Sequence, residues 1–167
     1  MTKRFVLWFS GIVLSFGLGL FLDHRLKTLA FPIWVKALAL LLIFFAVLLL
    51  ARSGRLLRKL GEPKEQWGWT TRLVTSDLYA CLRHPHHLGI GLFVSSLSVL
   101  VGGVWTFLLV SLFIWPAILW FLKSVEEKEL VEKFNGEYLI YKEKTPMLLP
   151  SPGYLLKMLL GKEGKGN

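Results

Sequence analysis

Long apolar blocks alternate with short charged segments along this chain. Residues 5–22, 31–51 and 88–122 contain a single charged side chain, that of Lys36. A helix needs about 20 apolar residues to cross the hydrocarbon core of a bilayer, and the third block is long enough for two crossings. The pattern therefore predicts four membrane-spanning helices, at about 5–22, 31–51, 87–102 and 104–122.

The first span and the turn between the last two spans each need an interpretation. The last two spans are joined only by Val101-Gly102-Gly103. This short turn has no polar side chain, and it suits a tight hairpin of packed helices. The first span follows Lys3 and Arg4, as in a secretory signal. It is long for such a signal, and no small-x-small cleavage site follows before Asp23. We therefore interpret it as a retained membrane span.

Composition and charge agree with a membrane protein. The chain has 167 residues, 54% of them hydrophobic, and a mean hydropathy of +0.55. A soluble domain of this size cannot bury so much apolar surface. Six of the Lys and Arg residues behind the net charge of +9 lie in 52–72, and only two lie in 23–30. With four spans, this bias places both termini on the cytoplasmic side, where the charges contact anionic lipid rather than nucleic acid.

The single cysteine, Cys81, excludes a disulfide within the chain and a thiolate metal cluster. No dinucleotide-binding glycine motif and no phosphate-binding loop is present. Candidate chemistry is therefore confined to two polar regions, 52–87 and 124–150, which emerge on the same side of the predicted bundle.

The first polar region ends in a cluster of Arg83, His84, His86 and His87 around Pro85. Proline suits the first turn of a helix, where a missing N–H costs nothing. His84 is therefore expected at the mouth of the third span, near the free amides of that helix end. Upstream, Trp67 and Trp69 are expected to anchor the loop at the membrane interface.

The second polar region is predicted to form an amphipathic helix, or a broken pair of helices, continuing out of the fourth span. Its apolar and aromatic residues recur at helical spacing beside many charges; they are Leu130, Val131, Phe134, Tyr138 and Tyr141. Asn135-Gly136 is the expected break. Glu126 and Glu127 follow the membrane boundary by one turn, level with the loop that carries His84.

Plainer interpretations exist for each of these residues. Glutamates on an emergent helix are usually solvated, and tyrosines at this level are often interfacial. The histidines are candidate metal ligands, but a metal needs three or four convergent groups. The remaining histidine, His24, lies in the loop expected on the other side. We therefore expect no metal.

The run LVTSDLYACLRHPHHLG resembles the membrane-embedded methyltransferases of the isoprenylcysteine carboxyl methyltransferase and phospholipid methyltransferase superfamily. That family has a Tyr, an Arg-His-Pro-x-Tyr-x-Gly motif, a further span, a Glu pair and a Phe-Gly-x-x-Tyr-x-x-Tyr segment before a basic-Val-Pro. The resemblance covers roughly residues 67–150. The matching positions are Tyr79, Arg83, His84, Pro85, Gly89, Glu126, Glu127, Phe134, Tyr138, Tyr141 and Lys144-Thr145-Pro146.

The chain departs from the family pattern at four places. His87 stands where the family has a tyrosine, and Asp77 and Asn135 stand where it has glycines. An arginine that the family often carries before the Glu pair is absent, and Lys123 is the nearest basic residue. The first two changes bear on cofactor binding, and the last bears on the substrate.

The resemblance implies an all-α integral membrane bundle of about four transmembrane helices with cytoplasmic amphipathic C-terminal helices. Residues 1–51 hold two N-terminal spans, 52–150 the methyltransferase core and 151–167 a tail, within one membrane domain. The implied activity is methyl transfer from S-adenosylmethionine to a lipid or small hydrophobic acceptor. Prenylated protein ends, phospholipid amines and small thiols are all candidate acceptors.

By the same resemblance, one set of residues forms the cofactor cradle: Thr71, Arg72, Leu73, Val74, Tyr79, His84, Pro85, His87, Gly89, Glu126, Glu127 and Tyr138. Glu126, and after it Glu127, suits the ammonium or ribose hydroxyls of the cofactor, and tyrosine faces attract its cationic methyl group. Arg83, His84 and Glu127 are the candidate catalytic residues. Arg83 is expected to hold an acidic group, and His84 or Glu127 to act as base for an amine acceptor.

Two other classes of protein share features with this sequence. Membrane sterol reductases have a similar C-terminal arrangement, but they are much longer and have more spans. A membrane module that has lost the reaction is suggested by His87 and Asp77. Binding of S-adenosylmethionine separates both from an active methyltransferase.

Overall fold

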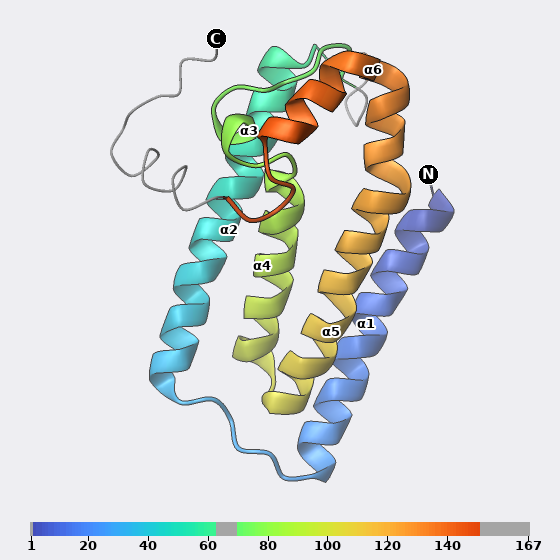
Figure 1. Ribbon diagram of the computed structural model, residues 1–167. Helices are drawn as coiled ribbons and strands as arrows, with labels where there is room; N and C mark the ends of the chain where they lie inside the picture. The colour runs from blue at the N-terminus through green and yellow to red at the C-terminus, as the bar shows by residue number, and fades with distance from the viewer. Residues whose placement is uncertain (1, 63–69, 151–167) are drawn as a thin grey trace. The chain divides into compact units, whose positions relative to one another are not determined.

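The computed structural model describes residues 2–62 and 70–150, and these form helices without a strand (Figure 1). The expected all-α class is confirmed. The expected anchors Trp67 and Trp69 and the tail at 151–167 lie outside the described residues. The elements are α1 (Thr2–Arg25), α2 (Ile33–Leu60), α3 (Leu78–Cys81), α4 (Pro85–Val101), α5 (Val104–Phe121), the π-helix η1 (Leu122–Glu126) and α6 (Glu127–Lys144).

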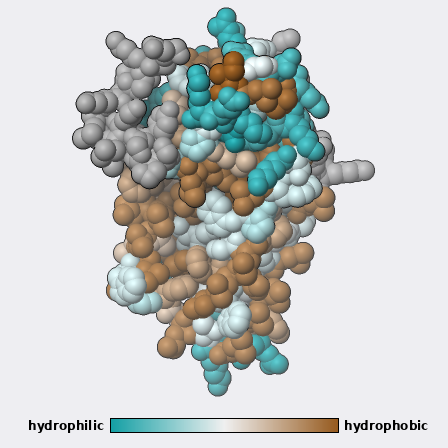
Figure 2. All heavy atoms as spheres, viewed as in Figure 1, coloured by the Kyte–Doolittle hydropathy of each residue, from teal (hydrophilic) through white to brown (hydrophobic). Residues whose placement is uncertain are grey.

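Three helical segments of the described chain are long and apolar enough to cross a membrane: Val6–Arg25, Ile33–Leu60 and Val104–Lys144. The helix expected as the third span is present as α4, which is apolar but has only 17 residues. Apolar side chains such as Leu7 and Leu112 are exposed on these helices, and Figure 2 shows hydrophobic residues over much of their visible face. Such a surface is stable against lipid rather than water.

The described residues separate into two compact units, which we describe in turn: an apolar unit (2–47 and 90–122) and a polar unit (48–62, 70–89 and 123–150). In the apolar unit, α1 packs along α5 (Figure 1). A Cβ atom at Gly19 would lie 2.5 Å from the Thr106 Cα, so the two backbones touch there. Small residues allow this close approach, on which helix association in membranes depends.

Asp23, at the end of α1, caps the N-terminus of α5. Its carboxylate accepts hydrogen bonds from the backbone N–H groups of Gly103, Trp105 and Thr106, at 2.7, 3.1 and 3.1 Å. The Thr106 hydroxyl donates a fourth, at 2.6 Å. Gly103 stands at the cap position and has no side chain of its own to do this. A residue distant in sequence therefore satisfies amides that every helix start leaves open.

In the polar unit, α6 is kinked where the sequence analysis placed its break. Asn135 has non-helical dihedrals, with φ 44° and ψ −124°, inside α6. Asp77, just before α3, has nearly the same dihedrals, with φ 57° and ψ −124°. These are the two positions where the chain departs from a glycine of the family pattern. The glycine-like backbone is therefore retained although the residue is not glycine, and such a conformation strains a side chain.

We expect Asn135→Gly to stabilise the folded chain by about 1 kcal/mol, because glycine adopts a positive φ without steric cost. Thermal unfolding in detergent measures the change. Glu137→Gly, at an exposed helical position two residues later, is the control and should destabilise by about 1 kcal/mol. If both glycines lower the unfolding temperature alike, the kink at Asn135 carries no strain.

Candidate functional site

The start of α4 and the end of α6 are joined through their backbones. The amide of Arg83 donates to the carbonyl of Pro146 at 2.9 Å, and that of His84 donates to the carbonyl of Met147 at 3.1 Å. Thr145 is buried beside this contact. The segment that follows α6 thus holds the Arg83-His84 backbone in place, which gives a structural reason for the Lys144-Thr145-Pro146 part of the sequence pattern.

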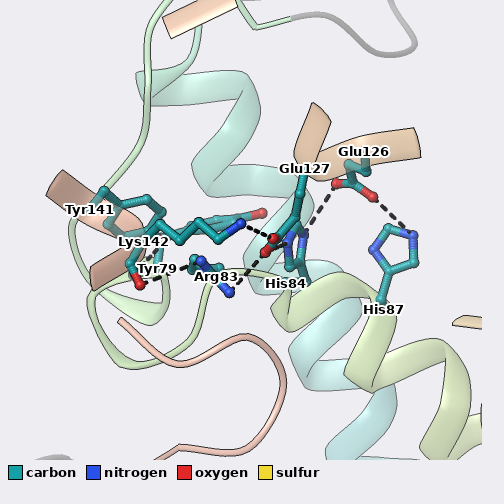
Figure 3. A network of polar contacts seen from close by, with 8 residues as sticks. All are labelled: Tyr79, Arg83, His84, His87, Glu126, Glu127, Tyr141 and Lys142. Carbon is teal, nitrogen blue, oxygen red and sulfur yellow. Dashed lines mark hydrogen bonds and ion pairs between the residues drawn. The ribbon is translucent and has the colours of Figure 1, made fainter. Parts of the chain in front are cut away.

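Glu127 lies at the centre of a buried ion-pair network (Figure 3). Its Oε1 is 2.8 Å from Arg83 Nη2, and its Oε2 is 2.8 Å from Lys142 Nζ. The His84 Nε2 atom lies 3.5 Å from the same Oε1. The side chains of Arg83, His84 and Glu127 are all nearly inaccessible to solvent. Burial of these charges is tolerable because each faces an opposite charge.

Glu126 has a different environment from its neighbour. Its Oε1 lies 3.3 Å from His84 Nδ1 and its Oε2 lies 3.4 Å from His87 Nε2, while 30% of its side chain remains exposed. His84 therefore stands between the two glutamates, with one ring nitrogen toward each (Figure 3). Burial by itself lowers the pKa of His84, but its contacts with Glu126 and Glu127 outweigh burial and raise that pKa above the usual value.

The tyrosines of the motif support the fold rather than line an open surface. The Tyr141 hydroxyl donates to the carbonyl of Tyr79 at 2.6 Å, and the Tyr79 hydroxyl donates to the carbonyl of Ser53 at 3.5 Å. Burial, with the nearby Glu126 carboxylate, raises the pKa of Tyr79. Tyr138 is completely buried, and its hydroxyl lies near the Glu127 carboxylate. In this conformation neither Tyr79 nor Tyr138 offers a free aromatic face.

The rest of the expected cradle divides into two groups. Pro85 and Gly89, in the first turns of α4, are buried next to the histidines in sequence. In 71–74, the amides of Thr71 and Arg72 already donate to the Gly61 carbonyl, at 2.7 and 3.2 Å. Arg72 also pairs with the exposed Glu62 at 3.0 Å. The bonds of Thr71 and Arg72 thus run to the end of α2. Within 71–74, the backbone groups of Leu73 and Val74 are the remaining candidates for contact with a cofactor.

Several residues that shape the site escaped the sequence analysis. Lys142 looked like an ordinary charge on an amphipathic helix. In the sequence, Ser53 marks the end of a predicted span; in the structure, its hydroxyl lies 3.3 Å from His86 Nδ1 and connects the start of α4 to α2. Arg52 pairs with the strained Asp77 at 2.8 Å. No local sequence pattern predicts these contacts, because the partners of Lys142, Ser53 and Arg52 lie 15, 33 and 25 residues away in the chain.

Comparison with known proteins supports the resemblance to membrane methyltransferases independently of the geometry. The model of the phospholipid methyltransferase family matches residues 28–137. The Protein-S-isoprenylcysteine O-methyltransferase of Schizosaccharomyces pombe is 34% identical over 80 residues, which are 47% of this chain and 33% of that protein. The chain therefore spans about a third of the length of this relative. No solved structure matches the chain.

Proposed function

The chain belongs to the phospholipid methyltransferase family, and we propose that it transfers a methyl group from S-adenosylmethionine to a carboxylate of a lipid or other hydrophobic acceptor. The three long apolar helices and the family support a membrane methyltransferase. The relative from Schizosaccharomyces pombe is named as an O-methyltransferase, which favours an oxygen acceptor. The observation that carries the proposal is the partly exposed Glu126, oriented by His84.

Glu126 has the properties that cofactor binding requires. S-adenosylmethionine presents an ammonium group and ribose hydroxyls, all of which are hydrogen-bond donors. The Glu126 Oε2 atom accepts no hydrogen bond within the described residues, although His87 Nε2 lies 3.4 Å away; this oxygen is itself buried, so a donor reaches it only when the side chain turns toward its exposed side. A carboxylate in this state gains a charge-assisted hydrogen bond when a donor arrives. When bound, the cofactor supplies a methyl group that its sulfonium activates toward nucleophiles.

The surroundings of His84 and Glu127 favour an acceptor that reacts without giving up a proton. His84 holds its proton more firmly than usual, since its pKa is raised. Glu127 is held between Arg83 and Lys142, so its basicity is weakened. An amine acceptor would need one of these groups as a base. A carboxylate is already ionised at neutral pH, and alignment of the reacting atoms then supplies much of the rate.

Arg83 takes a different role from the one first expected. We propose that it positions Glu127, because its guanidinium is buried against that carboxylate and not open to a substrate. The acceptor then enters from the bilayer between helices. The Lys and Arg bias of the loops supports cytoplasmic termini, so the cofactor enters from the cytoplasm.

The proposal predicts binding and methyl transfer together. Purified protein in detergent should bind S-adenosylmethionine by calorimetry, and Glu126→Ala should weaken binding at least tenfold, about 1.4 kcal/mol. With a labelled methyl group and native membranes, the label should enter a hydrophobic extract as an ester. Alkali releases label from a methyl ester as methanol, and leaves a methylated amine or thioether intact.

Glu132→Ala is the matched control, since Glu132 is an exposed glutamate on the same helix α6. It should bind the cofactor as the unmodified chain does. If the folded protein binds no S-adenosylmethionine, it is a module without the reaction. If label enters but resists alkali, the acceptor is an amine or thiol, and the carboxylate assignment is wrong.

A further inference from the structure

Three metal-ligating side chains converge beside the start of α4. His84, His87 and Glu126 each offer one donor atom, and these atoms lie within 4.8 Å of one another. The histidines of 83–91 are by themselves too few to hold a metal ion. The fold adds a carboxylate, carried by the end of η1, to the two histidines at the start of α4 (Figure 3).

The separations of these atoms suit a small ion with a tetrahedral shell. Zinc binds histidine nitrogen and carboxylate oxygen at about 2.0–2.2 Å, so neighbouring ligands of one tetrahedral zinc ion lie about 3.3–3.6 Å apart. His84 Nδ1 lies 3.3 Å from Glu126 Oε1 and His87 Nε2 lies 3.4 Å from Glu126 Oε2, so the carboxylate presents one oxygen to each imidazole. With one donor atom from each residue the set lies within 4.8 Å, and a bound ion would draw the three side chains slightly closer. Two imidazoles and one carboxylate are also a donor set that zinc favours.

A second layer of contacts orients the central ligand. With Nδ1 of His84 toward the three-ligand centre, its Nε2 faces Glu127 Oε1 at 3.5 Å. Metal-binding histidines usually direct their other ring nitrogen at a carboxylate, which fixes the tautomer and raises the basicity of the ligand. Glu127 is itself held by Arg83 and Lys142, both at 2.8 Å. The arrangement is therefore supported beyond its three ligands.

We propose that His84, His87 and Glu126 bind a zinc ion, with the fourth position open. Access is available on the side of Glu126 and His87, whose side chains are 30% and 18% exposed, while His84 is buried. His87 is the ligand that distinguishes this chain from the family pattern, which has a tyrosine at the same position.

A consequence follows that rests on the proposed function. The Glu126 carboxylate cannot bind a zinc ion and the ammonium or ribose of S-adenosylmethionine at the same time. Zinc and the cofactor therefore exclude each other, and zinc acts as an inhibitor that competes with the cofactor.

Titration of the purified full chain with Zn²⁺, without S-adenosylmethionine and against a chromogenic chelator, tests the site. The buffer is held well above the ordinary histidine pKa, because the pKa of His84 is raised and its imidazole must lose a proton to bind zinc. We expect one zinc ion per chain, at least tenfold weaker binding by His87→Phe, and no binding of Mg²⁺, which prefers oxygen ligands. His24→Ala and Cys81→Ser are the controls and should leave zinc affinity unchanged.

Replacement of zinc by Co²⁺ gives a second readout, because its visible absorption reports nitrogen and oxygen coordination. This spectrum, and its loss in Glu126→Gln, keeps the test informative if His87→Phe does not fold. The site is refuted if the chain binds no zinc, or if His87→Phe and Glu126→Gln both bind it as tightly as the unmodified chain.

The competition is tested separately, by adding zinc to the cofactor titration. An apparent Kd for S-adenosylmethionine that rises with zinc concentration supports mutual exclusion. Simultaneous binding of both overturns the exclusion but not the zinc site. Zinc binding by a protein that binds no S-adenosylmethionine overturns the proposed function alone.

Discussion

Glu127→Ala is expected to destabilise the folded chain by about 3–5 kcal/mol, because it leaves a buried positive charge without its partner. Arg83 and Glu127 are 8% and 5% exposed, and 2.8 Å separates their nearest atoms. Without the carboxylate, the Arg83 guanidinium keeps a 3.4 Å hydrogen bond to the Lys142 carbonyl, which is a neutral acceptor. A loss of this size approaches the total stability of many domains, and thermal unfolding in detergent should detect it readily.

Two further variants show whether burial is the cause. Lys142→Ala removes the other cation on Glu127, but Lys142 is 42% exposed, so we expect a loss below about 1 kcal/mol. Glu126→Ala should likewise cost less than Glu127→Ala, because Glu126 keeps contact with solvent. Equal stabilities for Glu127→Ala and Lys142→Ala would show that the network is not a buried charge pair.

Asp23→Ala is expected to destabilise the apolar unit by about 2 kcal/mol, at the upper end of the range for the loss of a helix cap. The substitution removes one acceptor group that serves three backbone amides and the Thr106 hydroxyl. The positive end of the α5 dipole also loses its counter-charge. Thermal unfolding in detergent, followed by helical circular dichroism, measures the effect.

His24→Ala is the matched control for this substitution. His24 is the next residue of α1 and is exposed, so its loss should change stability by no more than about 0.5 kcal/mol. Asp23→Asn keeps an acceptor without the charge and should fall between the two. A chain that tolerates Asp23→Ala as well as His24→Ala does not depend on this cap.

The two adjacent glutamates are expected to have different roles, Glu127 in stability and Glu126 in ligand binding. Glu127 is enclosed by cations and holds the Arg83 region together, whereas the Glu126 side chain is 30% exposed and has an oxygen without a hydrogen-bond partner among the described residues. Loss of Glu127 should therefore appear first in stability, and loss of Glu126 first in cofactor or zinc affinity. Measuring both properties on both variants tests this division directly.

The site could be predicted from the sequence in part. The order of Arg83-His84-Pro85, a further helix and Glu126-Glu127 indicated one shared site, and the structure brings these side chains together. The burial of Tyr79 and Tyr138 could not be foreseen, because an aromatic residue at helical spacing has the same pattern whether it faces a ligand or a neighbouring helix. The backbone bonds to Pro146 and Met147 also leave no mark in side-chain patterns.

The sequence by itself determined the helices and their environment. Apolar blocks of span length and the break at Asn135 are local properties, read within one or two helical turns. Only the tertiary structure decided that Glu127 is buried and Glu126 partly exposed, that Asp23 caps α5, and that His87 faces a carboxylate. The physical reason is that these outcomes depend on which distant groups meet and how much water they exclude, and neither is fixed by the spacing of residues along one helix.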